Sequence, residues 1–154
     1  MKANLVTIDE ANAMIPLLCS IVMDIRSSWN AIITKRAELE KLEKGPVAAK
    51  EEEEKEKPGR SEELKAELNI LIERINTYIR EVEDLGCFVE EFKRGIINFP
   101  SLYHGRKVFL CWGLGDDDVT CWHELDESYN DRVKIANPCQ FLNHNPNSPK
   151  KIRG

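Results

Sequence analysis

The sequence contains no Cys-x-x-Cys pair, and its five cysteines among 154 residues are an odd number. Both features argue against a disulfide framework, because disulfides pair cysteines and persist in oxidising compartments. The cysteines therefore indicate reduced, partly buried thiols in a cytoplasmic protein. They are Cys19, Cys87, Cys111, Cys121 and Cys139.

A long hydrophobic run is also missing. The most apolar stretch, residues 13–23, is shorter than the ~20 residues that a membrane-spanning helix needs. It follows Asp9 and Glu10, whose negative charge is wrong for the start of a signal peptide. We therefore expect a soluble cytoplasmic protein with no membrane partner.

Positive charge is outweighed by negative charge, with 22 Lys and Arg against 27 Asp and Glu and a net charge of −5. The chain has no basic stripe and no aromatic residues on a known nucleic-acid-binding module, which argues against a nucleic-acid partner. Gly113-x-Gly115 is not a phosphate-binding loop, since no helix follows it and no lysine lies in place. No serine–histidine–acid set can be identified, and we predict no cofactor.

Heptad patterning is abundant. Thr7 and Glu10 have the spacing of a capping box, which predicts a helix over residues 7–42. Pro16 lies inside this helix and predicts a kink, because the apolar repeat keeps its phase across the proline. The repeat consists of Ile8, Ala11, Ile15, Leu18, Val22, Ile25, Trp29, Ile32 and Leu39.

Residues 43–60 are interpreted as a linker, because Gly45-Pro46 and Pro58-Gly59 lie near its ends and its middle is rich in Glu and Lys. This composition favours a solvated connection over an acidic docking motif. Shortening the linker is expected to change stability little, since loop-closure entropy depends weakly on length.

A second helix is predicted over residues 61–85. Ser61 is a good N-cap residue, and Gly86 stands where a left-handed residue beyond a helix end is expected. Its heptad has no gap and consists of Leu64, Leu68, Leu71, Ile75, Tyr78, Val82 and Leu85.

Residues 86–136 carry the dense β-signal and complete a single predicted domain over residues 1–136. Pro100 marks the edge or end of a strand, and residues 103–106 form a turn. Residues 137–154 read as an irregular C-terminal tail. The predicted strands are 87–92, 108–112, 119–123 and 133–135, with further apolar residues at 96–99.

The register between residues 108–112 and 119–123 depends on their turn. A two-residue type II′ turn at Gly115-Asp116 pairs Trp112 with Val119, Leu110 with Cys121 and Val108 with His123. In this preferred register Cys111 lies on the opposite face from Cys121 and His123. A longer loop, shifted by one residue, pairs Cys111 with Cys121 instead.

The predicted fold class is α+β: a long, antiparallel, coiled-coil-like helical hairpin followed by a small antiparallel β-sheet. Two helices alone cannot cover all their apolar positions, which include Met14, Leu17 and Ile21 beside the first seam and Ile70, Ile72 and Ile79 off the second. Because an unburied patch of this size is unusual in a monomer, we expect a homodimer formed through the helices.

Several motifs resemble the prokaryotic family called domain of unknown function 2203. The resemblance covers residues 7 to about 135 and implies no activity, since the family has none established. Its motifs are Glu-Ala-Asn-Ala-Met-Ile-Pro (10–16), Gly-Ile-Ile-Asn-Phe-Pro (95–100), Gly105-Arg106, Leu-Cys-Trp (110–112), Gly115-Asp116, Trp-His-Glu (122–124) and Arg132. The family usually has Lys-Asp at Glu90-Glu91, aspartate at Asn98, arginine at Gly113 and glycine at Ser128.

One candidate site is a zinc site at Cys111, Cys121 and His123 with a nearby carboxylate. Thiolate and imidazole suit tetrahedral zinc, and three protein ligands plus water are a catalytic arrangement. The spacing is not a recognised zinc pattern, and a buried cysteine more often packs as a small apolar residue.

A second candidate is a polar site formed by His123, Glu124, Asp126, Asp131 and Arg132. Histidine can act as an acid or base near neutral pH, and arginine can bind an anion through its fork. The competing interpretation is an ion-paired turn with His123 hydrogen-bonded at a strand end, which we favour.

These observations favour a non-enzymatic assembly or partner-binding protein that uses the helical hairpin. The alternative is a small enzyme or metal-binding protein with a polar site around His123, Glu124 and Arg132. Stoichiometric zinc or manganese in the purified protein would favour the alternative.

Overall fold

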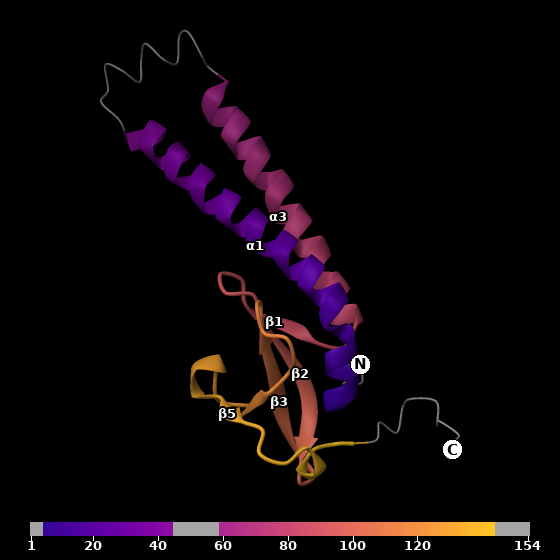
Figure 1. The fold of residues 1–154 in the computed structure, drawn as a ribbon. Helices are drawn as coiled ribbons and strands as arrows, with labels where there is room; N and C mark the ends of the chain where they lie inside the picture. Colours follow the sequence, from indigo (N-terminus) through magenta and orange to yellow (C-terminus); the bar gives the residue numbers. More distant parts are fainter. Residues whose placement is uncertain (1–4, 45–58, 144–154) are drawn as a thin grey trace.

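The computed structural model describes residues 5–44 and 59–143. Two antiparallel helices, α1 (Ile8–Lys44) and α3 (Arg60–Asp84), form a long hairpin that projects from a small sheet (Figure 1). The sheet is antiparallel, with five strands in chain order. The strands are β1 (Phe88–Glu91), β2 (Ile96–Tyr103), β3 (Arg106–Gly113), β4 (Cys121–Glu124) and β5 (Val133–Lys134). The α+β prediction is confirmed.

The start of α1 has the predicted capping box. The backbone N–H of Thr7 donates to Glu10 Oε1 at 3.0 Å, and the N–H of Glu10 donates to Thr7 Oγ1 at 3.0 Å. Because each side chain takes one free N–H of the first turn, the helix begins where the sequence predicts. It continues through Pro16 to Lys44.

The second helix differs slightly from its prediction at its start. Its N-cap is Gly59, so α3 begins at Arg60 and Ser61 lies inside its first turn. Gly86 follows its end with φ of 98°, as predicted for a left-handed residue that only glycine adopts at no cost. Most of the predicted linker, residues 45–58, lies outside the described residues.

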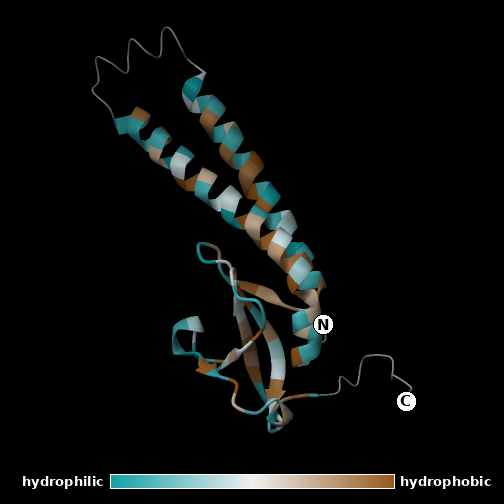
Figure 2. Cartoon of the chain, viewed as in Figure 1, coloured by the Kyte–Doolittle hydropathy of each residue, from teal (hydrophilic) through white to brown (hydrophobic). Residues whose placement is uncertain are grey.

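The two predicted seams face one another along the hairpin, where apolar residues follow both helices (Figure 2). One core cluster joins the first part of α1 to the sheet, and a second lies farther along, between the helices. Buried seam residues are Ala11, Leu18, Val22, Ile25 and Ile32 in α1 and Leu64, Leu68, Leu71, Ile75 and Val82 in α3.

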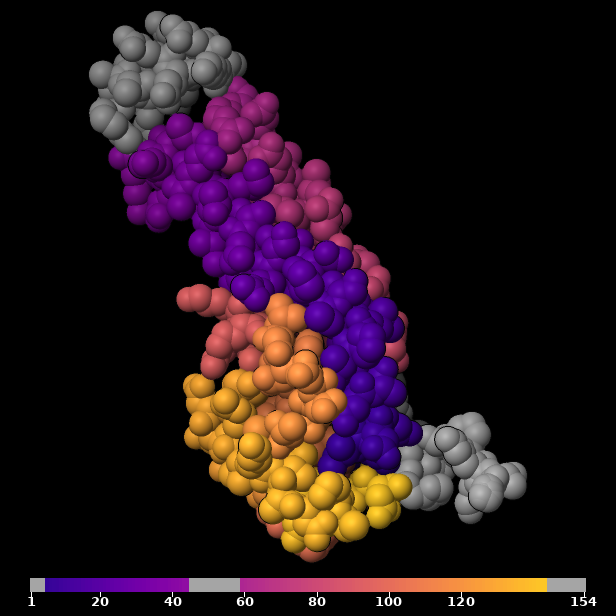
Figure 3. All heavy atoms as spheres, in the orientation of Figure 1, coloured from indigo at the N-terminus to yellow at the C-terminus, as the bar shows by residue number. Residues whose placement is uncertain are grey.

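The first part of α1 packs directly on the sheet formed by β1 to β5 (Figure 3). Ile21 is buried there and Met14 packs against the same cluster, so the sheet covers much of the flank that the sequence leaves without a partner. Leu17 stays 53 % exposed. None of the described helices is both long and apolar enough to cross a membrane.

Strands β2 and β3 are joined by a two-residue turn. His104 and Gly105 both have positive φ, 51° and 84°, which is the requirement of a type I′ hairpin turn. Pro100 lies inside β2, so it does not end the strand. The proline is tolerated because β1 pairs with β2 only up to Asn98, which leaves Pro100 on an open edge where its carbonyl accepts from the N–H of Val6.

The preferred register of the β3–β4 hairpin is wrong by one residue, and the shifted alternative is correct. Because side chains alternate between faces, the shift places Cys111, Cys121 and His123 on one face. The observed pairs are Val108 with Glu124, Phe109 with His123, Leu110 with Trp122 and Cys111 with Cys121.

A longer connection explains the shift. The N–H of Asp116 donates to the carbonyl of Gly113 at 2.9 Å, so Gly115, with φ of 109°, is the third residue of a turn. The N–H of Val119 then donates to Asn12 Oδ1 on α1 at 2.7 Å instead of extending the ladder. This contact between distant parts of the chain delays the start of β4 to Cys121.

Residues 137–143 belong to the packed structure. Phe141 is buried, forms an isolated bridge with Tyr103, and joins the main core cluster. The sequence predicts an irregular tail from residue 137 onward, and its last part, residues 144–154, lies outside the described residues.

Candidate functional site

A group of polar side chains lies on the face of the sheet opposite α1. Asn98 pairs with Cys111 across β2 and β3, and Cys111 pairs with Cys121 across β3 and β4. Paired residues share a face, so these three side chains form a row with His123 beside it, two residues along β4 from Cys121. The α1 face carries Val108, Leu110 and Trp112 instead.

Glu90 is the centre of this group. Its Oε1 accepts from Asn98 Nδ2 at 2.9 Å and lies 3.3 Å from His123 Nε2, and its Oε2 accepts from the N–H of Tyr129 at 2.8 Å. The pairing of β1 with β2 is irregular between Val89 and Glu91, which makes Glu90 the extra residue of a bulge. Bulges re-aim side chains, and this one turns a carboxylate toward the sheet face.

The proton arrangement around His123 follows from its two ring nitrogens. Nδ1 lies 2.8 Å from the carbonyl oxygen of Glu124, which can only accept, so Nδ1 carries a proton. Nε2 lies within ion-pair distance of Glu90 Oε1 but forms no hydrogen bond with it. Nε2 and Asn98 Oδ1 both lack a hydrogen-bond partner among the described residues.

Access to this histidine is closed. Its side chain has a relative exposure of 0 %, against 21 % for Glu90. Phe109 stands edge-on to its ring, with centroids 5.7 Å apart. A general acid or base must come within hydrogen-bond reach of its substrate, and the described residues leave no path for one to His123.

The two cysteines of the row lie in apolar surroundings. Cys111 is buried beside Ile96 and Tyr129, and Cys121 packs against the same cluster. Burial raises the pKa of the Cys111 thiol to about 12, so it is protonated at neutral pH. Zinc binds the thiolate form, and no three His, Cys, Asp or Glu side chains of residues 5–44 and 59–143 are grouped to hold a metal ion.

The pKa of Cys87 is also raised by burial to about 12. A buried thiol with a raised pKa favours folding below its ordinary pKa of 9.0, and that contribution is lost as the pH rises toward about 12. Above pH 9 we therefore expect each buried thiol to lower the free energy of unfolding by at most about 1.4 kcal/mol per pH unit. Urea unfolding on both sides of this pH tests it: Cys111→Ala should weaken the pH dependence, and Cys139→Ala, at an exposed site, should not.

The predicted polar site around His123 is not brought together. Glu124 faces away from His123 and pairs with Arg106, whose guanidinium lowers the pKa of the Glu124 carboxyl. Asp126 is exposed, and within the described residues it forms no hydrogen bond or ion pair. Asp131 caps the short helix Tyr129–Asp131 by accepting from the N–H of Ser128.

Arg132 lies on Tyr129 and not on His123. Its Nη1 donates to the Tyr129 carbonyl at 2.9 Å, and its guanidinium carbon stands 3.9 Å from the centre of the Tyr129 ring. The Arg94 guanidinium also lies over that ring, at 5.4 Å. These contacts fix Tyr129, whose N–H holds Glu90, so Arg132 supports the polar group from outside it.

Sequence reasoning missed Glu90, Asn98 and Tyr129 as members of this group. Glu90 and Asn98 stand out only as departures from the family pattern, and their mutual contact depends on a bulge that no local signal marks. The 3₁₀-helix that presents the N–H of Tyr129 is preceded by Ser128 with Asp131 three residues later, a capping-box spacing that could have revealed it.

Comparison with known proteins gives one result. A family model described as an uncharacterized conserved protein, DUF2203, matches residues 4–135. No curated protein and no solved structure matches the chain. The matched residues span both helices and the sheet, as the motifs around Leu-Cys-Trp and Trp-His-Glu led us to expect, and the chain belongs to this uncharacterized conserved family.

Proposed function

We propose that this protein is a non-enzymatic cytoplasmic assembly module in which two copies pair through their helical hairpins. The observation that carries the proposal is an apolar groove along the outer half of the hairpin. The enclosed polar group around Glu90 and His123 supports a non-enzymatic role, because its histidine is sealed from substrates.

The groove is lined by residues of α1 from Trp29 to Glu43 and of α3 from Lys65 to Ile72. These belong to the part of the hairpin that extends away from the sheet (Figure 1). The core cluster in this part draws its residues from α1 and α3 alone. At its inner end Trp29 meets Phe92, which follows β1, with ring centroids 5.2 Å apart. A pair of helices buries only one stripe of each, whereas a bundle of four buries a wider face. A second hairpin would supply the missing cover.

Ile33 from α1 and Ile72 from α3 line this groove and are 48 % and 46 % exposed. The partly buried Trp29 also lines the groove and packs against the core cluster between the two helices. The groove has a volume of about 780 Å³, open to solvent. Large apolar side chains at the exposed ends of an unfilled groove are typical of an interaction site.

The charges around the groove favour a second copy as its occupant. Arg36 and Lys65 line it together with Glu40 and Glu43. A twofold interface places the same patch on both subunits, so a patch that carries both signs can match cation to anion with itself. A partner of one strong charge would meet repulsion from half of these groups.

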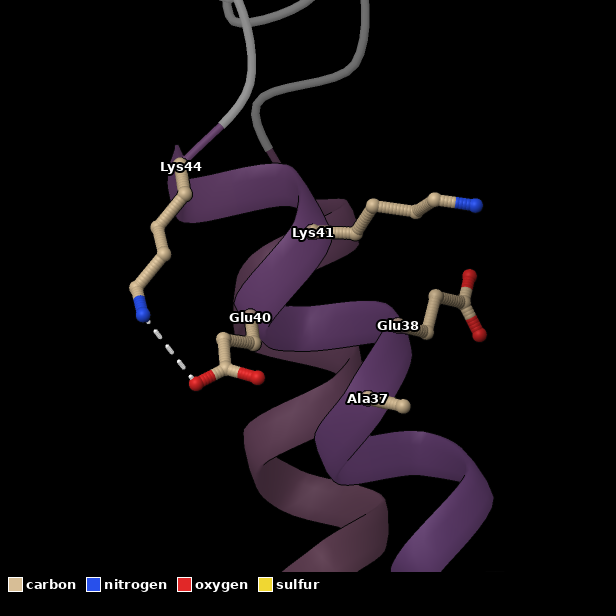
Figure 4. A pocket seen from close by; sticks show the side chains of 5 residues that line it. All are labelled: Ala37, Glu38, Glu40, Lys41 and Lys44. Atoms are coloured by element: carbon tan, nitrogen blue, oxygen red, sulfur yellow. Dashed lines mark hydrogen bonds and ion pairs between the residues drawn. The ribbon is translucent and has the colours of Figure 1, made fainter.

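The tip of the hairpin offers a poorer surface. The hollow near the end of α1 is lined by Ala37, Glu38, Glu40, Lys41 and Lys44, and its charged side chains point in different directions (Figure 4). Lys44 pairs with Glu40 at 3.2 Å, and Glu38 accepts from Arg60. Exposed ion pairs of this kind contribute little energy, which supports the groove over the tip as the proposed pairing surface.

Replacing Ile72 with aspartate is expected to weaken dimerisation at least roughly 30-fold, because each dimer would bury two unpaired carboxylates. The matched control is Ile70→Asp, since Ile70 is on the same helix, is 55 % exposed, and lies outside the groove. Ile79→Asp is unsuitable as a test of dimerisation, because Ile79 packs against the core cluster between the two helices and its replacement would also destabilise the fold. Light scattering on a sizing column measures both; equal dimer content in the two variants would contradict the proposed surface.

A further inference from the structure

We propose that Cys111 and Cys121 form a peroxide-responsive dithiol, which oxidation converts into a disulfide across β3 and β4. Neither the family match nor the proposed pairing of hairpins assigns them this role. The proposal rests on the register, which makes these two residues direct cross-strand partners on one face.

The backbone geometry suits a disulfide. Paired residues of an antiparallel ladder have Cα atoms about 4.5–5.5 Å apart, inside the range of about 4.4–6.8 Å that disulfides occupy. Their side chains leave the sheet on the same side, and Cys121 packs against the cluster that contains Cys111. The backbone spacing of this pair is therefore compatible with a disulfide.

The two thiols differ in exposure, which assigns their order of reaction. Cys121 is half-buried and Cys111 is buried, so a small peroxide reaches Cys121 first. The Cys121 sulfur attacks one peroxide oxygen, the O–O bond breaks, and the products are a sulfenic acid and water. The Cys111 sulfur then attacks the Cys121 sulfur; the S–S bond forms, and the hydroxyl leaves with the Cys111 proton as a second water. One peroxide is reduced, and the dithiol loses two electrons.

None of the other three cysteines has a cysteine as its cross-strand partner in the described sheet. Cys87 is buried at the end of α3, where its Sγ contacts the carbonyl of Val82 at 3.5 Å. Cys19 packs in the α1 cluster, and Cys139 is exposed. Oxidation of the folded chain should therefore produce one internal link, between residues 111 and 121, and leave Cys139 as the site of simple surface oxidation.

The consequence of the link lies in the segment between the two residues. Residues 114–120 connect β3 to β4, and Val119 in this segment binds Asn12 of α1. A disulfide at its base closes a short loop in the unfolded chain and stabilises the folded one. Oxidation is therefore expected to raise the melting temperature by several degrees.

The test treats the reduced full-length protein with a small excess of hydrogen peroxide, alkylates the remaining thiols and digests without reduction. Trypsin leaves both cysteines in one peptide, because no lysine or arginine lies between them, so a protease that cuts before aspartate is used to cleave at Asp116 to Asp118. The expected product is two peptides joined through Cys111 and Cys121, absent in Cys121→Ser and unaffected by Cys139→Ser.

The same reaction on urea-unfolded protein is the control that shows whether the fold selects this disulfide. It should yield several different cysteine pairings. The proposal is overturned if the folded protein keeps Cys111 and Cys121 alkylatable while Cys139 is oxidised. It is equally overturned if the folded and unfolded chains yield the same distribution of links.

Discussion

Replacing Trp112 with alanine is expected to lower the free energy of unfolding by about 4 kcal/mol, the largest loss of any single substitution proposed for this chain. Trp112 is 1 % exposed and lies in the core cluster between the sheet and α1. Its ring N–H also donates to the carbonyl of Asp116 at 2.8 Å, so truncation removes both apolar contacts and an anchor of the β3–β4 connection. Urea unfolding followed by circular dichroism measures the loss.

Trp122 provides the matched control. It is half-buried on the neighbouring strand, where it stacks on Tyr103 with ring centroids 4.5 Å apart. Trp122→Ala should therefore cost clearly less than Trp112→Ala. Equal losses in the two variants would contradict the placement of Trp112 inside the core cluster and of Trp122 at its margin.

Replacing Glu90 with alanine is expected to cost about 2–4 kcal/mol, although the position is near the surface. The change leaves the Asn98 amide and the Tyr129 N–H without their shared acceptor, and it removes the carboxylate beside the buried His123 ring. Donors that remain buried without a partner lose their hydration and gain nothing in return.

Glu91→Ala is the control for this substitution. Glu91 is the next residue of the same strand, and its carboxylate pairs only with the exposed Arg94 among its described partners. The expected cost is below about 1 kcal/mol, as for other surface ion pairs. Chemical denaturation of the two variants side by side decides the matter, and a Glu90 variant as stable as the Glu91 variant would show that the polar group is not a structural unit.

The helices were predictable because their signals are local. The capping box at Thr7 and Glu10 begins α1, and Gly86 ends the second helix with a positive φ. Most of the heptad residues are buried, because a helix turns its seven-residue repeat toward one side. The turn at His104 and Gly105 follows from similar local chemistry.

The sheet register was not predictable from local turn preferences. Gly115 adopts a positive φ as expected. However, the N–H of Val119 donates to Asn12 Oδ1, more than a hundred residues earlier in the chain, and not to the neighbouring strand. The polar group around Glu90 was not predicted for a related reason. The bulge at Glu90 and its contact with Tyr129 join β1 to a 3₁₀-helix far along the chain. Contacts between distant segments determine both features, and the periodicity of the sequence does not predict such contacts.

The pairing of hairpins is the central claim of this account, and sedimentation equilibrium of the wild-type protein tests it most directly. The chain has a mass of 17.7 kDa. We predict a weight-average mass that rises with concentration toward twice this value at tens of micromolar, with Ile72→Asp shifting the rise to higher concentration and Ile70→Asp leaving it in place. A constant mass of one chain across the whole concentration range would contradict the account.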